Sequence, residues 1–128
     1  MQISEFQFTN PVLMNIEFRI NREFEPGEGK EIEADISFDM NICKNPEEME
    51  AIVELTVFIG SKGKESPFYI TATEGADFKW NESVKNPDRF LKHNAPALLV
   101  SYLRTAIAAV TAASPYNAYN LPFINFSK

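Results

Sequence analysis

Strict two-residue alternation of apolar and polar side chains is the feature that most limits what this 128-residue chain can fold into. Between residues 31 and 42, every even-numbered position is apolar and every odd-numbered position is polar or charged. Successive side chains of a β-strand point to opposite faces of a sheet. This segment is therefore predicted to be a strand with one buried face and one face in water.

Three further segments alternate in the same way, at residues 12–21, 51–59 and 68–73. The first is expected to continue from Phe6 and Phe8 through a kink at Pro11, and the last to end at Glu74 and Gly75, with a bulge or bend at the glycine. Turn-forming residues at 26–29, 45–48 and 60–64 separate the segments. Short connections favour antiparallel neighbours, so the pattern predicts a four-stranded antiparallel sheet.

The alternation also predicts which side chains share a face. In the first strand, one face is expected to hold Val12, Met14, Ile16, Phe18 and Ile20. In the middle strands, the acidic residues Glu31, Glu33, Asp35, Asp39 and Glu54 are expected in solvent. The side chains expected to face a helix are Ile32, Ile36, Phe38, Val53 and Val57.

A nearly all-apolar helix is predicted at residues 95–113, after a polar stretch with a short helix following Pro87. Asn94 is expected to cap it, Pro96 to lie in its first turn and Pro115 to end it. One sheet face covers only part of so wide an apolar arc, so we predict that a second copy of the chain covers the rest. The residues predicted at this interface between copies are Leu99, Tyr102, Leu103, Ala106, Ile107 and Val110.

Composition excludes several classes of partner and chemistry. Twelve basic residues against 18 acidic ones give a net charge of −6, which argues against nucleic acids and anionic membranes. His93 is the only histidine and Cys43 the only cysteine, so no metal, cofactor or catalytic residue is predicted and the chain is expected not to be an enzyme. The start of the chain has no secretory pattern, which predicts a cytoplasmic protein. Its length predicts one domain over residues 1–128.

The order and spacing of several motifs resemble the SecB export chaperone family. The sequence Pro-Ala-Leu-Leu-Val-Ser-Tyr-Leu-Arg at 96–104 is similar to the family's helix opening, with Tyr102 and Arg104 at its tyrosine and arginine. Asn-Leu-Pro-Phe-Ile-Asn-Phe at 120–126 is similar to the segment after that helix, with the proline moved by one position. The resemblance implies an α+β fold of four antiparallel strands with one long helix on one face. It also implies a dimer of dimers that holds unfolded preproteins for SecA.

The chain departs from the family pattern at several positions. The positions of the SecA-contacting acidic residues fall on Asn15, Arg19 and Thr71, none of which is acidic, so we expect weak or absent SecA binding. The tryptophan before the family's second strand is missing, and Phe24 is the only aromatic residue there. The family continues into a second helix beyond the residues that correspond to Lys128, so we expect an apolar groove to be more open here.

The favoured function is a SecB-like holdase for non-native polypeptide, serving export or a toxin–antitoxin client. The alternatives are a small-ligand-binding or hot-dog-like enzyme dimer, which would need a buried acid or histidine facing the helix, and a phage or mobile-element assembly protein. Aromatic side chains outside the regular pattern are expected to bind the client, because they offer large contact area with few rotors to freeze. They are Phe24, Phe78, Trp80, Tyr116, Tyr119, Phe123 and Phe126.

Overall fold

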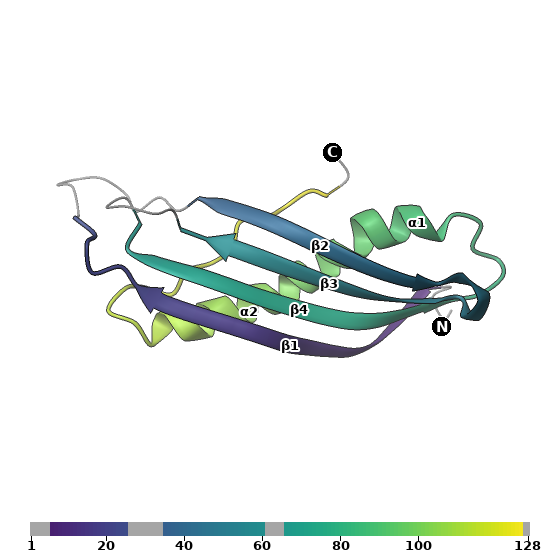
Figure 1. The fold of residues 1–128 in the computed structure, drawn as a ribbon, viewed down its shortest axis with the longest axis horizontal. Coiled ribbons are helices and arrows are strands. Elements are labelled where there is room, and N and C mark those ends of the chain that lie inside the picture. The colour runs from purple at the N-terminus through teal and green to yellow at the C-terminus, as the bar shows by residue number, and fades with distance from the viewer. Residues whose placement is uncertain (1–5, 26–34, 61–65, 127–128) are drawn as a thin grey trace.

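A computed structural model describes residues 6–25, 35–60 and 66–126. Its strands, β1 (Phe6–Ile20), β2 (Ile36–Asn45), β3 (Glu50–Ile59) and β4 (Phe68–Trp80), form one antiparallel sheet in the order β1-β4-β3-β2. The long helix α2 (Ala95–Ala112) lies across one face of this sheet, and the other face is uncovered (Figure 1). The predicted α+β architecture is confirmed.

The two central strands bury their helix-facing side chains, apart from the half-buried Trp80 at the end of β4. On β3 these are Ala51, Val53, Leu55, Val57 and Ile59, none more than 3% exposed. Their alternation is the predicted one, and β-branched residues fill a half-buried pleated surface well. The outward residues between them, such as Thr56, which hydrogen-bonds to Thr73 of β4 at 2.7 Å, are partly or fully exposed.

Strand β2 confirms the prediction for one edge of the sheet. Ile36 and Phe38 are half-buried on the helix side, and Asp35 and Asp39 are exposed. Glu54 points to the outer face of β3 but is only half-exposed. The predicted strand residues Glu31, Ile32 and Glu33 lie outside the described residues.

Strand β1 departs from the predicted alternation, because its register with β4 shifts between Thr9 and Val12 and again between Leu13 and Asn15. Residues paired across a ladder share a face, so Leu13, opposite Glu74, is on the helix side. Val12, opposite Gly75, is on the outer side. Met14 is also outside, since its sulfur lies 3.0 Å from where a Cβ on Gly75 would be. The predicted placement of Val12 and Met14 beside Ile16 is therefore wrong, and the cause is the extra residue that each bulge inserts.

Strand β4 is longer than predicted, because it continues through Gly75 to Trp80. The irregularity expected at Gly75 lies opposite it, in β1. Phe78 and Trp80, predicted to follow the strand, are part of it and pair with Phe8 and Phe6. Phe78 is 1% exposed and belongs to the core, so its predicted contact with a client is wrong for this fold.

The long helix begins earlier than predicted. Helix α1 (Pro87–Arg89), a wide turn η2 (Phe90–Asn94) and α2 form one continuous helix. Asn94 is not its cap: it has helical φ and ψ of −84° and −41° and makes no capping hydrogen bond. In the wide turn, the N–H of Ala95 donates to the carbonyl of Phe90, five residues back. This geometry accommodates Pro96, which has no N–H and would crowd the carbonyl four residues before it.

The most apolar side of helix α2 packs against its own chain. Leu99, Leu103 and Ile107 are 0% exposed and pack into the core with β3 and β4. They are not available to another copy, so the prediction that they lie between copies is wrong. Tyr102 is exposed and Ala106 and Val110 are half-buried, and for these three the interface stays a prediction. The continuous helix is long and apolar enough for a membrane span by length and composition, but the core helices of globular proteins meet the same criteria.

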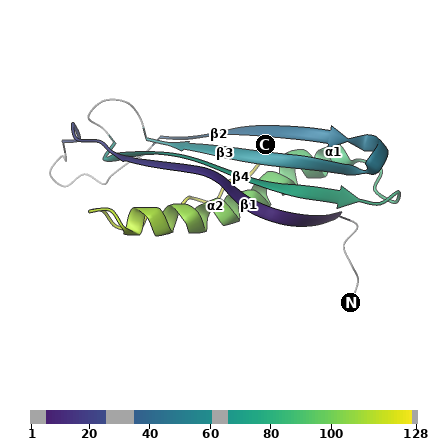
Figure 2. The same cartoon turned by 60° about the horizontal axis from the view of Figure 1, so that its bottom comes forward.

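The segment after the helix provides part of the cover that was expected from a second copy. It runs back along α2 on the side of β2 (Figures 1 and 2). Thr111 Oγ1 accepts a hydrogen bond from the Tyr119 N–H at 2.7 Å, and Arg104 Nε donates to the Leu121 carbonyl at 3.0 Å. His93 Nδ1 lies 2.7 Å from the Phe126 carbonyl oxygen. These contacts hold Leu121 in the core, only 4% exposed.

Candidate functional site

Apolar side chains remain exposed on the helix side of the sheet along β1. Phe8 and Leu13 are each 40% exposed and Tyr102 of α2 is 37% exposed. The rings of Phe8 and Tyr102 are 6.4 Å apart at centre. We call Phe8, Leu13 and Tyr102 the helix-side strip. Nothing else in the described chain covers it fully, and large exposed apolar patches typically mark binding sites.

A charged residue, Glu74, borders the strip: it pairs with Leu13 across the β1–β4 ladder and with Leu55 across the β3–β4 ladder. Glu74 is therefore on the helix side of the sheet, and it is 4% exposed. Desolvation by burial raises the pKa of its carboxyl above the ordinary 4.5. Within the described residues it has no hydrogen-bond or ion-pair partner. Among the described residues of the sheet, it is an acid at a helix-facing position, where the alternation predicted apolar side chains almost throughout.

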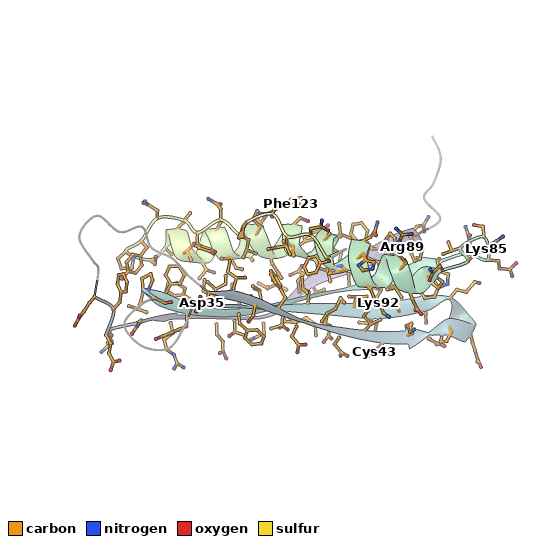
Figure 3. All side chains as sticks on the ribbon, turned by 90° about the horizontal axis from the view of Figure 1, so that it is seen from above. Asp35, Cys43, Lys85, Arg89, Lys92 and Phe123 are labelled. Atoms are coloured by element: carbon orange, nitrogen blue, oxygen red, sulfur yellow. The ribbon has the colours of Figure 1, made fainter. Side chains whose placement is uncertain are left out.

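Most of the predicted client-binding aromatics seal the core rather than stand free. Five of them are half-buried against neighbouring rings or the core, namely Phe24, Trp80, Tyr116, Tyr119 and Phe126. Phe126 packs edge-on to Phe38 at 5.5 Å, and Tyr119 packs on Phe68 at 6.0 Å. Phe123 differs: it is 90% exposed and projects from the C-terminal segment on the side of the molecule opposite the outer sheet face (Figure 3). Binding of a client by these residues stays a prediction, with Phe123 the most accessible.

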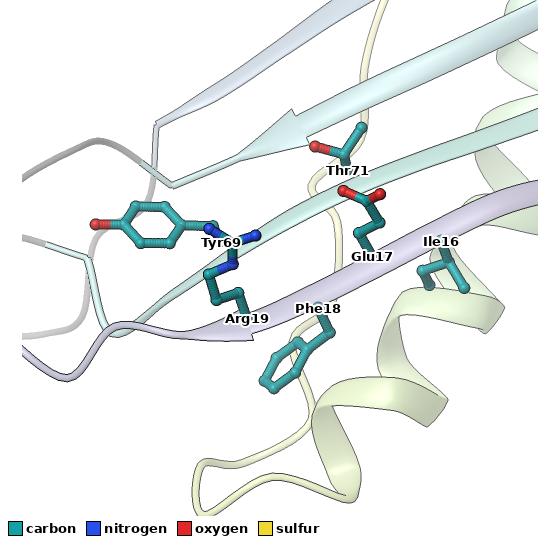
Figure 4. A pocket seen from close by; sticks show the side chains of 6 residues that line it. All are labelled: Ile16, Glu17, Phe18, Arg19, Tyr69 and Thr71. Carbon is teal, nitrogen blue, oxygen red and sulfur yellow. The ribbon is translucent and has the colours of Figure 1, made fainter.

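The outer face of the sheet carries the positions that the family resemblance aligned with SecA contacts. Arg19 and Thr71 line an open pocket there together with Glu17 and Tyr69. Figure 4 shows Arg19 and Tyr69 lying against one another and Glu17 close to Thr71. Asn15 is exposed and pairs with Thr73, which also points outward. The predicted outward placement of Asn15, Arg19 and Thr71 is confirmed, and no acidic group stands at any of them.

The groups needed for catalysis are not brought together in the described part of the chain. His93 is held against a backbone carbonyl of the C-terminal segment, and Cys43 is exposed on the outer side of β2. No three His, Cys, Asp or Glu side chains among the described residues are grouped to hold a metal ion. Glu74 is the buried acid that a hot-dog-like enzyme would require. Its ladder neighbours are leucines, and neither a base nor a nucleophile from the described residues lies beside it.

Sequence reasoning missed Phe8, Leu13 and Glu74 as site residues. Glu74 could have been identified from the sequence, because it follows Ile70 and Ala72 at the two-residue spacing of the apolar helix-facing positions. Leu13 was assigned to the wrong face because the two bulges around it could not be read from the alternation. The left-handed backbone of Asn10, with φ of 53°, is the local irregularity that accompanies the first bulge.

No family model matches the chain. The uncharacterized protein MJ0357 of Methanocaldococcus jannaschii is 26% identical over 121 residues, which covers 93% of this chain and 78% of that protein. Among solved structures, the Mycobacterium tuberculosis SecB-like chaperone Rv1957, in complex with a ChAD peptide from the Rv1956 HigA1 antitoxin, matches with a TM-score of 0.75. Its sequence identity is 12%, with 94% of this chain and 91% of that chain covered.

A protein of unknown function from Streptococcus agalactiae matches less closely, with a TM-score of 0.53 and 16% identity over 93% of this chain and 98% of that chain. These likenesses establish the fold. The predicted SecB-like arrangement of four antiparallel strands and one long helix is confirmed.

Proposed function

We propose that this protein is a SecB-like chaperone that holds non-native polypeptide through exposed apolar surface. The observation that carries the proposal is the helix-side strip, in which Phe8, Leu13 and Tyr102 stay accessible although the core below them is complete. A chain that needed only to fold would gain by covering them, at about 25 cal/mol for each Å² of apolar surface removed from water. The solved SecB-like chaperone with the same fold was bound to a peptide, which supports a polypeptide client.

Binding would combine apolar contact with backbone pairing and would need no cofactor. An extended client segment can lie along an edge strand and place alternate side chains on one face. The helix-side strip follows the edge strand β1, so both kinds of contact are offered at one place. Phe123 adds a further exposed ring on the helix side.

We place the protein in the cytoplasm, as a homo-oligomer, with the dimer of dimers of the SecB family as the working assembly. We expect weak or absent binding to SecA, because Asn15, Arg19 and Thr71 offer it no carboxylate. An antitoxin or another dedicated client is therefore favoured over general preprotein export.

The test is suppression of aggregation of a chemically denatured protein by the purified full chain, at a one-to-one molar ratio and without nucleotide. We expect light scattering from the aggregating substrate to fall, because the strip binds unfolded segments before they associate. Unchanged scattering at a several-fold excess of this protein would contradict the proposal. Static light scattering of the protein alone, at micromolar concentration, checks the assembly, and a monomer would contradict it.

A further inference from the structure

Residues 117–126, which follow the long helix, hold a fixed path although they form neither a helix nor a strand. They run back along α2 on the side of β2 (Figures 1 and 2). Side chains of the helix hold their backbone, at the Tyr119 N–H and at the carbonyls of Leu121, Pro122 and Phe126. An extended peptide in a binding site is held in a similar way, through its backbone and through pockets for alternate side chains. We call residues 117–126 the strap.

The helix side chains that hold the strap lie in one stripe. They are His93, Arg104 and Thr111, and their separations of 11 and 7 residues are close to three and two whole helical turns. At roughly 1.5 Å per residue, His93 and Arg104 are about 16 Å apart along the helix. The carbonyls that these two hold belong to Phe126 and Leu121, and an extended chain covers those five residues in about 16 Å as well. The stripe therefore matches an extended backbone in length, whatever the side chains of that backbone are.

Apolar side chains of the strap pack on the sheet and helix beside this stripe. Leu121 is 4% exposed and has an exposed residue on either side. Phe126 packs edge-on against Phe38 of β2, and Tyr119 packs on Phe68 of β4. The strap thus covers apolar surface that would otherwise face water. We call the surface that receives it the strap site, which consists of His93, Arg104, Thr111, Phe38 and Phe68.

The strap is the kind of segment that opens before the rest of a fold. Six of its ten residues are exposed, and Leu121 is the buried one. In β3, by contrast, every second residue is buried along the whole strand. Segments with irregular backbone and few buried contacts open locally at a small part of the free energy of global unfolding. Opening of the strap alone would expose the strap site and leave the four strands paired.

We propose that the strap is an internal competitor: it occupies a second polypeptide site, from which an extended segment of a client displaces it. The client backbone would take the hydrogen bonds of the helix stripe, and its apolar side chains would take the places of Leu121 and Phe126. The inference rests on the proposed chaperone function and adds its regulation. The helix-side strip is open at all times, whereas the strap site stays covered until a client competes for it, which limits the apolar surface that could aggregate.

The experiment measures competition between the strap and a copy of itself. A fluorescently labelled synthetic peptide with the sequence of residues 117–126 is added to the full-length protein, and binding is followed by anisotropy. Leu121→Ser in the protein removes the buried side chain of the strap and leaves the strap site unaltered. A ligand that binds only the open form gains apparent affinity as the open fraction rises. We therefore expect Leu121→Ser to bind the peptide roughly tenfold more tightly than the unaltered protein.

Asn120→Ser is the matched control, because Asn120 is the exposed neighbour of Leu121 in the strap. It should bind the peptide as the unaltered protein does. Adding Arg104→Met to Leu121→Ser removes a donor from the strap site itself, so the gain in affinity should be lost. Leu121→Ser should also suppress aggregation at a lower molar ratio than the unaltered protein, and the free peptide should reduce that suppression.

Equal affinity of Leu121→Ser and the unaltered protein for the peptide, or no binding to either, would overturn the inference, while suppression of aggregation by the unaltered protein would leave the holdase proposal standing. Absence of suppression in both proteins would count against both proposals. Circular dichroism establishes that the variants are folded. Should Leu121→Ser not fold, hydrogen–deuterium exchange of the unaltered protein decides: strap amides should exchange at least about 100-fold faster than those of β3. Exchange as slow as in β3 would overturn the inference.

Discussion

Strands β3 and β1 are both rich in apolar residues, but only β3 hides them. Every helix-facing side chain of β3 is buried, since β2 and β4 flank it and α2 covers it. Strand β1 lies at an edge, and Phe8, Val12, Leu13 and Met14 are all at least 40% exposed. Within one sheet, therefore, the centre buries its apolar residues and the irregular edge leaves apolar surface exposed.

The largest effect is expected at the centre, from Leu103→Ala. Leu103 is 0% exposed beneath α2, and truncation of such a leucine costs about 2–5 kcal/mol in free energy of unfolding. Urea unfolding followed by circular dichroism measures the loss. Leu103→Glu should prevent folding altogether, whereas the interface prediction would have it only separate copies. Ser101→Ala, on the exposed side of the helix, is the control; a small loss in Leu103→Ala would mean that the core is packed differently.

A smaller loss of stability is expected from Thr111→Val, which keeps the shape of the side chain. Thr111 Oγ1 donates to the Ile107 carbonyl at 2.8 Å and accepts from the Tyr119 N–H at 2.7 Å. Without the oxygen that N–H loses its partner, a cost of about 1–3 kcal/mol. Thr105→Val removes a longer, exposed bond to Ser101 and should cost less. Equal melting temperatures for the two variants would show that the C-terminal segment is not anchored at Thr111.

A pH-dependent change is expected from Glu74→Gln. Burial raises the folded-state pKa of Glu74, so the folded protein favours the protonated form and loses stability as pH rises above the ordinary value of 4.5. Glutamine carries no charge, so the variant should melt at a higher temperature than the unaltered protein at pH 7. At pH 3.5 that gain should be gone. Calorimetry at both pH values gives the comparison, and a variant that is less stable at pH 7 would show that the carboxylate is held by a partner.

The sequence predicted the sheet, the long helix, and which side chains of β2 and β3 face that helix, because each depends on a local period of side chains. It did not predict the faces of β1, since a bulge depends on how β4 pairs with it. The role of Leu103 was also misjudged, because the C-terminal segment had not been recognised as a cover for the helix. Leu121, Arg104 and Thr111 provide that cover through contacts between residues 8 to 17 positions apart. For the site, the aromatic content pointed to seven side chains, and of these the fold leaves only Phe123 fully accessible.

The smallest effect on stability is expected from Phe123→Ala, because this side chain is 90% exposed and exposed positions usually change stability by less than about 0.5 kcal/mol. Tyr119→Ala should instead lower the melting temperature by several degrees, since its ring packs on Phe68. Thermal melts of the two single variants separate these roles. If Phe123→Ala also leaves client binding unchanged, the exposed client surface is restricted to the helix-side strip.

Whether the helix-side strip binds the client is tested most directly by two double variants of β1 in the aggregation assay. Phe8→Ser with Leu13→Ser removes apolar surface from the helix side, and Val12→Ser with Met14→Ser removes it from the outer side of the same strand. Melting temperatures establish that both variants are folded. We expect the helix-side variant to lose suppression of aggregation and the outer-side variant to keep it. Equal suppression by both, or loss only in the outer-side variant, would contradict it.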